Sequence, residues 1–212
     1  MATVKPFDPV RRDGKRRRAA LLEAASDLFL EVGYEAASLN QVVARAGGSK
    51  SSIYTYFTDK AGLFEAVVDE MVAKLLVPLE LTSQSEQSFQ QTLLVIADRT
   101  LRVLLSPKGI GLCRIVYMES PRMPEIGAVF YKNGPDRAIR QLTYYLKSQT
   151  KAGTINCPNP SMAAEFFWGM LLHRPMLEGL CSLHQPMAEN QYDAYVQAVV
   201  DDFIRSQISL CV

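Results

Sequence analysis

The stretch GGSKSSIYTYFTDK, residues 47–60, decides how the first third of the chain is interpreted. Its centre, IYTYF, is an unbroken row of β-branched and aromatic residues, which is the composition of a strand. The flanking stretches have helical periodicity, however, and a lone short strand among helices would lack a pairing partner. If Ser49 is an N-cap, residues 50–57 instead make about two helical turns, with Ile53 and Phe57 on one face. We therefore predict a short helix over residues 50–57.

Apolar residues recur at three- and four-residue steps on both sides of this segment. They are Leu21, Ala24, Ala25, Leu28 and Val32, then Leu39, Val42, Val43 and Ala46, and after the segment Leu63, Phe64, Val67, Val68, Met71, Val72 and Leu75. Gly33 is placed to end the first of these helices, and Ser38 to cap the second. Thr58 or Asp59 would cap the last one, which we expect Pro78 to interrupt. Two short helices between two longer ones are typical of a helix-turn-helix.

The remaining sequence is also helical in pattern. We expect helices near residues 84–105, 109–119, 124–151, 160–183 and 187–209. Pro135 and Pro175 fall inside periodic stretches and should kink or split those helices. No stretch is convincing as a strand, so the predicted fold class is all-α, with an N-terminal helix-turn-helix domain and a larger C-terminal helical domain.

Charge is distributed unevenly, although the net charge is only +1. Residues 1–18 contain seven Lys or Arg against two Asp or Glu. We interpret residues 1–14 as a flexible basic arm that could enter a DNA minor groove, with a solvated tail as the alternative. The four cysteines are scattered without metal-ligand spacing, which favours reduced thiols and no metal. Because neither a signal peptide nor a membrane span is evident, we expect a cytoplasmic protein. We also expect no cofactor.

The residue types of the 50–57 segment suit contact with duplex DNA. A helix N-terminus attracts phosphate through its free N–H groups, and Lys50, Ser51 and Ser52 would add side-chain donors there. Thr55 is small enough to approach a base edge, and Lys60 would lie beside the phosphate backbone. The alternative is a short amphipathic helix that only packs.

Several matched motifs of residues 15–71 resemble the N-terminal DNA-binding domain of the TetR family of bacterial transcriptional regulators. They are AALLEAASDLFLEVGYEAASL (residues 19–39), VVARAGGSKSSIYTYF (42–57) and DKAGLFEAVV (59–68). The resemblance implies phosphate contacts by Ser38, Lys50, Tyr54, Tyr56 and Lys60, and base contacts from among Asn40, Ser51, Ser52 and Thr55. Gly48 stands where the family usually has valine, and Ser51–Ser52 where Gly-Thr is common, so the base readout differs in detail.

The C-terminal region resembles one branch of repressors in that family, through FYKNGPDRAIRQLTYYL (residues 130–146) and AAEFFWGMLLHRPMLEGL (163–180). The resemblance implies a DNA-binding domain over residues 15–75 and a regulatory and dimerisation domain over residues 76–212. It also implies a homodimer formed by the last two helices, a pseudo-palindromic DNA operator and a small-molecule effector. Candidate effector-binding residues, expected to face the domain interior, are Phe89, Arg99, Tyr117, Met118, Phe130, Trp168 and His173. Ordinary core packing is the alternative for such an aromatic and Met stripe.

The leading hypothesis is thus a dimeric repressor released from DNA by a ligand. The alternatives are a regulator that needs no ligand or that activates, a helical enzyme, and a protein-interaction module using the basic arm. The chain contains no G-x-S-x-G, no H-E-x-x-H and no phosphate-cradling glycine loop, so we do not expect an enzyme.

Overall fold

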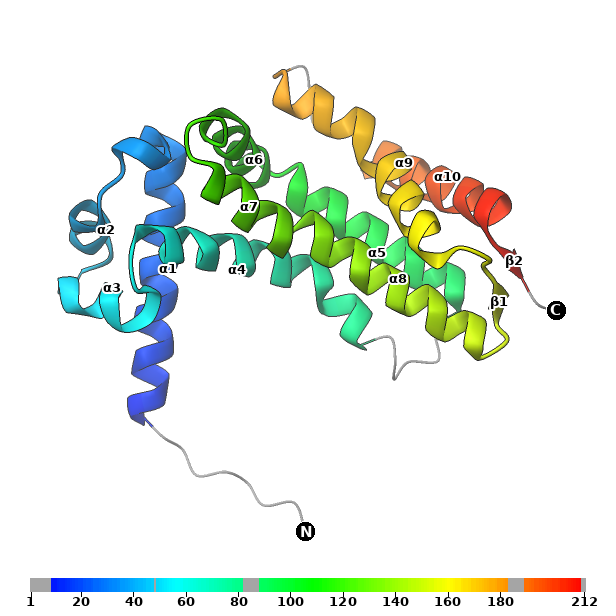
Figure 1. Ribbon diagram of the computed structural model, residues 1–212, viewed down its shortest axis with the longest axis horizontal. Helices are drawn as coiled ribbons and strands as arrows, with labels where there is room; N and C mark the ends of the chain where they lie inside the picture. The colour runs from blue at the N-terminus through cyan, green and yellow to red at the C-terminus, as the bar shows by residue number, and fades with distance from the viewer. Residues whose placement is uncertain (1–8, 48, 82–87, 183–188, 211–212) are drawn as a thin grey trace, which may run out of the picture. The chain divides into compact units, whose positions relative to one another are not determined.

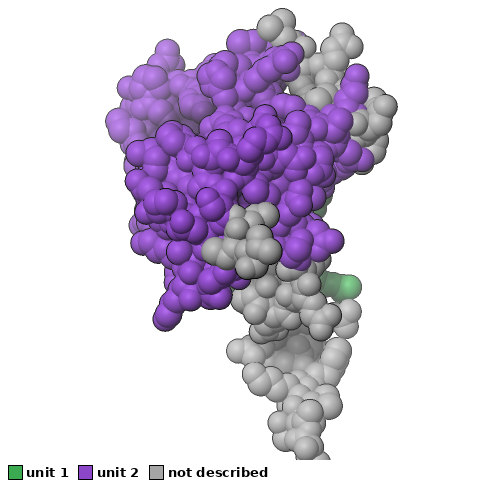
Figure 2. All heavy atoms as spheres, turned by 90° about the vertical axis from the view of Figure 1, so that its right-hand side faces the viewer, with its two compact units in different colours: residues 1–67 green, residues 68–212 purple. Residues whose placement is uncertain are grey.

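The computed structural model describes residues 9–47, 49–81, 88–182 and 189–210, and it is almost entirely helical (Figure 1). The chain divides into two compact units, residues 1–67 and 68–212 (Figure 2). The division falls inside a helix, eight residues before the boundary expected between residues 75 and 76. The all-α fold class predicted from periodicity is confirmed.

Unit 1 is built from α1 (Pro9–Ala36), α2 (Leu39–Ala46), α3 (Lys50–Phe57) and the first part of α4 (Lys60–Leu81). Three aromatic rings meet edge-on or tilted at its centre: Phe29, Tyr34 and Phe64, with centroids 5.2–5.6 Å apart. Ile53 and Phe57 are buried with them in the unit's apolar core. A core of this kind joins α3 to its neighbours although α3 is too short to be stable alone.

Unit 2 contains α5 (Phe89–Leu104), α6 (Pro107–Glu119), α7 (Pro124–Asn133), α8 (Pro135–Lys151), α9 (Pro160–Leu180) and α10 (Glu189–Gln207). The buried apolar faces of α5, α8, α9 and α10 form one core, with Phe167 and Phe203 in edge contact at 5.0 Å. Two short strands, β1 (Ile155–Asn156) and β2 (Ser209–Leu210), pair antiparallel. Their ladder ties the loop before α9 to the segment after α10.

The structure tests the predicted helix limits one by one. The 124–151 stretch is split into α7 and α8 at Pro135, as one of the two expected outcomes there, because Gly134 has non-helical angles and Pro135 starts a new helix. Pro175 lies inside α9, and α4 continues past Pro78 to Leu81, so neither proline ends its helix. The strands β1 and β2 were not predicted, since two-residue pairings carry no periodic signal. Predicted helical residues 84–87, 183 and 187–188 lie outside the described residues, as does Gly48.

The N-terminal arm also differs from the prediction. Residues 9–14 form the first turns of α1, because Pro9 suits the start of a helix and Lys and Arg are good helix formers. Residues 1–8 lie outside the described residues. Gly33 breaks α1 as expected, with φ 82°, although one more turn follows to Ala36. Val32, expected on the apolar face, is 39% exposed.

Candidate nucleic-acid interface and ligand cavity

Helix α3 forms over residues 50–57, as we predicted from the sequence. Ile53 is fully buried, whereas Tyr54 is 56% exposed and Thr55 is also exposed. The side chains of Lys50 and Ser51 lie exposed in the first turn. One face of α3 therefore anchors it to unit 1, and the other presents a cation, hydroxyls and a phenol to the surroundings.

The N-terminus of α3 is arranged differently from the prediction at Ser49. Ser49 occupies the N-cap position, but its side chain makes no hydrogen bond to the helix backbone. Its Oγ instead lies 2.6 Å from Ser51 Oγ and 3.4 Å from Ser52 Oγ. The Ser52 N–H donates to the Ser49 carbonyl oxygen at 3.0 Å. The N–H groups of Lys50 and Ser51 have no side-chain cap and can meet an anion, at the end where the helix dipole attracts negative charge.

Thr55 has its hydroxyl partly engaged. Its Oγ1 donates to the Ser51 carbonyl oxygen at 2.8 Å, a bond along the helix itself. The oxygen can still accept a hydrogen bond, and the methyl group is unaffected. Thr55 is therefore better placed for an apolar contact with a thymine methyl than for donating to a base.

Helix α2 and its N-cap supply two further predicted contact residues. Ser38 forms a complete capping box with Gln41: its Oγ accepts from the Gln41 N–H at 3.3 Å, and its backbone N–H donates to Gln41 Oε1 at 2.9 Å. The Ser38 Oγ also donates to Gln41 Oε1 at 2.7 Å. The cap is confirmed, and it occupies the hydroxyl hydrogen that a phosphate contact would use. Asn40 is exposed in the first turn of α2.

Lys60 performs a structural role that the sequence did not indicate. Its Nζ donates to the Glu35 carbonyl oxygen at 2.9 Å and lies 4.5 Å from the centre of the Tyr34 ring. The half-buried ammonium therefore joins α4 to the end of α1. Asp59 caps α4, accepting from the Gly62 N–H at 2.8 Å, as one of the two predicted alternatives.

The N-terminal part of α1 packs on the helix-turn-helix, which the sequence analysis missed. Arg17 donates from Nη1 to the Gly47 carbonyl oxygen at 3.1 Å, and Arg18 lies over the Phe57 ring at 5.4 Å. Gly14 lies beside the Tyr56 hydroxyl, which a Cβ at that position would approach to 3.4 Å. Arg17 and Arg18, which follow the predicted 1–14 arm, thus contact the turn and α3, while Lys15 and Arg16 remain exposed.

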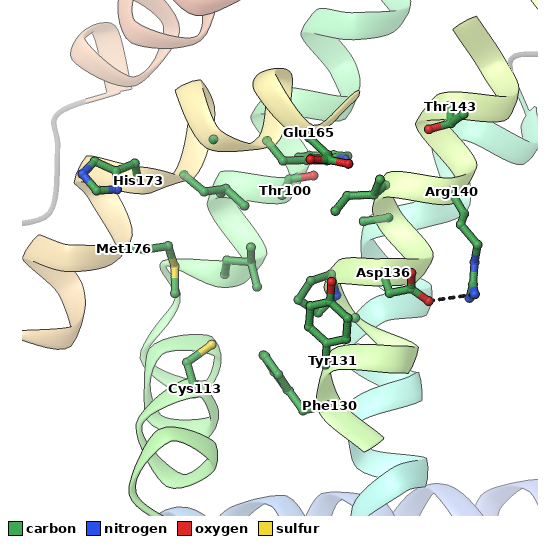
Figure 3. A pocket seen from close by; sticks show the side chains of 18 of the residues that line it. Thr100, Cys113, Phe130, Tyr131, Asp136, Arg140, Thr143, Glu165, His173 and Met176 are labelled. Atoms are coloured by element: carbon green, nitrogen blue, oxygen red, sulfur yellow. Dashed lines mark ion pairs between the residues drawn. The ribbon is translucent and has the colours of Figure 1, made fainter. Parts of the chain in front are cut away.

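A cavity of about 1030 Å³ lies within unit 2, at the upper end of the size usual for small-molecule sites (Figure 3). Its aromatic lining consists of Tyr117, Phe130, Tyr131, Tyr144 and Trp168. Leu104, Cys113, Ile139, Leu172 and Met176 are among its other apolar lining residues. Helices α5 to α9 all contribute, so the cavity is enclosed by most of the unit's helices.

Four of the seven predicted effector-binding residues line this cavity: Tyr117, Phe130, Trp168 and His173. The other three do not. Phe89 is buried in the core, where it stacks on Tyr145 with centroids 5.9 Å apart. Arg99 is exposed on the outer face of α5, and Met118 is 74% exposed, so the expectation that both face the interior is wrong.

The charged side chains that line the cavity are either paired with each other or exposed to solvent. Asp136 pairs with Arg140 at 2.7 Å, and Lys147, Glu165 and His173 are exposed. Cys113, in contrast, is buried, and burial raises the pKa of its thiol to about 12. Burial also raises the pKa of the Tyr117 hydroxyl. Both groups are uncharged near neutral pH.

The described residues meet neither the requirements of a metal site nor those of a membrane-spanning helix. Within them no cluster of three His, Cys, Asp or Glu side chains could hold a metal ion. In the same part of the chain, every helix is too short or too polar to span a bilayer.

A two-turn helix held behind a tight turn, with a polar face outward, defines a helix-turn-helix protein; a cavity-bearing all-α unit accompanies it. Comparison with known families agrees. Residues 21–67 match the family described as bacterial regulatory proteins, tetR family. Residues 91–206, more than half of the chain, match the C-terminal domain of AefR-like transcriptional repressors. The chain therefore belongs to the TetR family of transcriptional regulators.

Curated relatives include both a transcriptional activator and transcriptional repressors. The transcriptional activator FasR of Mycolicibacterium smegmatis is 39% identical over 75 residues, and the transcriptional repressor ComR of Escherichia coli is 44% identical over 55. These matches span only 34% and 26% of this chain, and the same shares of those proteins. The transcriptional regulator YvkB of Bacillus subtilis is 27% identical over 86% of this chain and 96% of its own.

Solved structures match over nearly the whole length. A TetR-family regulator from Mesorhizobium loti has a TM-score of 0.77 at 26% identity, covering 91% of this chain and 96% of its own. The flavonoid-responsive regulator FrrA has a TM-score of 0.69 at 26% identity, covering 91% and 97%.

Proposed function

We propose that the protein is a dimeric, sequence-specific DNA-binding repressor whose operator affinity is controlled by a small molecule in the unit 2 cavity. The observation that carries the DNA-binding part is α3: its apolar face is buried and its polar face is exposed, with an uncapped N-terminus. Family members are regulators of this class. DNA contact would involve Lys50, Ser51, Ser52, Tyr54 and Thr55 most directly, with Tyr56 and Asn40 at the margin of the same surface.

Two predicted phosphate contacts have a weaker case. Ser38 has its hydroxyl hydrogen on Gln41, and Lys60 has its ammonium on the Glu35 carbonyl oxygen. Lys50, in contrast, is exposed in the first turn of α3, where its charge adds to the helix dipole. We therefore assign the principal phosphate contact of α3 to Lys50.

A salt titration tests this assignment. Lys50→Ala is expected to lower the affinity for duplex DNA and to reduce the slope of log K against log salt by about one, because one counterion fewer is released. Lys132→Ala, an exposed lysine of α7 in unit 2, is the matched control and should leave the slope unchanged. Equal slopes for wild type and Lys50→Ala, measured by fluorescence anisotropy, would contradict the assignment.

The proposed homodimer is supported by α9. One face of this helix is buried in unit 2, while Met162, Phe166, Met170 and Leu177 lie 38–50% exposed. Their spacing of four, four and seven residues places them along one stripe, which a single chain leaves in contact with water. A second copy of the chain packing α9 and α10 against it would cover the stripe and present two α3 helices to successive major grooves.

Sedimentation measures this directly. Phe166→Glu is expected to shift the protein from dimer to monomer and to weaken operator binding. Val95→Glu replaces an equally exposed apolar residue of α5 and should remain dimeric. A wild-type protein that sediments as a monomer at micromolar concentration would refute the dimer.

Repression is favoured by the long match of residues 91–206 to the C-terminal domain of AefR-like repressors. The activator FasR matches over only 75 residues. A reporter gene placed behind the operator separates the two. Deleting the regulator should raise expression if it represses and lower expression if it activates. Control by a small molecule is supported by the cavity and by FrrA, which is flavonoid-responsive.

A further inference from the structure

Three buried polar atoms without a hydrogen-bond partner among the described residues all line the cavity of unit 2. They are Thr100 Oγ1, Thr143 Oγ1 and Trp168 Nε1. Thr100 is 3% exposed and Trp168 is 8% exposed, so bulk water does not readily satisfy them. A fourth such atom, Gln141 Oε1, lies outside the lining. Native folds rarely leave buried polar groups unpaired, and three around one cavity indicate a ligand that pairs with them.

The chemistry of these atoms restricts what they can bind. The indole N–H of Trp168 donates and cannot accept, so the group facing it must be an acceptor. The two hydroxyls can donate or accept. Thr100 lies on α5 and Thr143 on α8 (Figure 3), and Trp168 lies on α9. A ligand oxygen, as in a ketone or a phenol, can accept from Trp168 and from one of the two hydroxyls.

Charge restricts the ligand further. The buried lining near these atoms is uncharged, and Cys113 stays a neutral thiol because burial raises its pKa to about 12. The charged lining residues are either paired, as Asp136 is with Arg140, or exposed. An ionised group placed against Thr100 and Trp168 would lose its hydration without gaining a counter-charge. The buried part of the ligand must therefore be uncharged.

The aromatic lining completes the description. Tyr117, Phe130, Tyr131, Tyr144 and Trp168 come from four helices, α6 to α9, and offer ring faces and edges to a flat molecule. We propose that the cavity binds an uncharged polycyclic aromatic compound through an oxygen substituent that accepts from Trp168 and from Thr100, with Thr143 available to a second polar group of the ligand. This inference deepens the proposed function and rests on it only for the consequence at DNA.

A matched set of probes tests the ligand class. Fluorene and 9-fluorenone share one tricyclic frame, and only the ketone carries an acceptor; fluorene-9-carboxylate adds a negative charge. Binding is measured by quenching of Trp168, the single tryptophan of the chain, and by calorimetry. We expect fluorenone to bind about ten-fold more tightly than either of the others, because one or two neutral hydrogen bonds are gained. Hydrophobic transfer cannot produce this order, since the ketone is the more polar of the two neutral probes.

Three results would overturn the inference. One is equal or tighter binding of fluorene, another is preference for the carboxylate, and the third is no binding of any probe up to its solubility limit. Each would mean that the unpaired atoms do not select an uncharged acceptor.

Variants assign the hydrogen bonds. Thr100→Val and Trp168→Phe, followed by calorimetry, should each weaken fluorenone binding about three- to ten-fold and leave fluorene binding unchanged. Thr92→Val is the matched control, because Thr92 is a buried threonine on the same helix but lies outside the lining. Thermal melting of each variant confirms folding. Equal losses for fluorene and fluorenone would contradict a specific hydrogen bond.

The DNA assay separates this inference from the proposed function. If fluorenone binds with the expected preference but leaves operator affinity unchanged, the ligand class stands and ligand-controlled release fails. If the protein binds its operator but does not prefer fluorenone to fluorene, the ligand class fails and the DNA-binding function stands.

Discussion

Replacing Gly62 by alanine should destabilise unit 1, although alanine is ordinarily the better helix former. Gly62 lies in the first turn of α4, and a Cβ there would overlap the carbonyl oxygen of Phe57, the last residue of α3. It would also lie 3.2 Å from the Phe57 carbonyl carbon and 3.6 Å from Asp59 Oδ1. The turn joining α3 to α4 is thus so close to α4 that only glycine fits.

The size of the effect follows from two opposing contributions. Alanine in place of glycine stabilises a helix by about 0.5–1 kcal/mol. Overpacking costs about 1–3 kcal/mol, and the upper part of that range applies because backbone, not a flexible side chain, must move. The expected net result is a loss of roughly 1–2 kcal/mol in the free energy of unfolding of unit 1. Displacement of Phe57 would also disturb α3 and weaken DNA binding.

The assay can separate the two units. Circular dichroism follows the helices of both units, whereas Trp168 fluorescence reports on unit 2 alone. Gly62→Ala should shift the unit 1 transition to lower urea and leave the fluorescence transition in place. Ala61→Gly, one residue away in the same helix, measures how much the difference in helix propensity alone changes the free energy of unfolding. If Gly62→Ala raised the free energy of unfolding by about the amount that Ala61→Gly lowers it, the close contact with Phe57 would be refuted.

Three further changes have defined outcomes. Arg114→Ala should lower the free energy of unfolding of unit 2 by about 2–3 kcal/mol, measured by Trp168 fluorescence. Arg114 donates to the Gly179 and Leu180 carbonyl oxygens at the end of α9 and to Ser182 Oγ, at 2.6–3.2 Å. A loss below about 0.5 kcal/mol would show that these hydrogen bonds are dispensable. Ser38→Ala should lower the stability of unit 1 by about 1 kcal/mol through loss of the capping box, seen by circular dichroism, and an unchanged midpoint would contradict that role. In a Cys211→Ser background, a thiol reagent at pH 8 should modify the exposed Cys181 rapidly and Cys113 only on unfolding. The pKa of Cys113, about 12, leaves about one thiolate in ten thousand at that pH. Rapid labelling of Cys113 in the native protein would contradict its burial.

Periodicity and caps were sufficient to predict most of the fold. Ser38 and Gly33 mark helix ends through local chemistry: Ser38 caps α2, and Gly33 breaks the helical angles of α1. Residues 50–57 were predicted helical against their strand propensity because the flanking helices left a strand no partner. Pro78 was misjudged, because α4 continues through it to Leu81, whereas Pro175 lies inside α9 without splitting it.

The sites were only partly predictable, because they depend on which way each side chain points after packing. Arg99 is one residue from Thr100, which does line the cavity, and the pattern of buried positions on α5 separates the two. Met118 and Tyr117 on α6 are both exposed, and only Tyr117 lines the cavity. Lys60 was assigned to a phosphate contact, and Arg17 and Arg18 were given no role of their own, but all three contact backbone carbonyls or rings distant in sequence. Such partners become visible only when α1 is placed against the turn and α3.

The most direct test of the central claim, that the exposed face of α3 reads DNA, is parallel selection of duplexes from a random pool with wild-type protein and Thr55→Ala. The wild type should enrich a motif with two-fold symmetry, and Thr55→Ala should lose preference at one base pair in each half-site while keeping the rest of the motif. Enrichment of no motif by the wild type, or of an identical motif by both proteins with undiminished preference at every position, would contradict it.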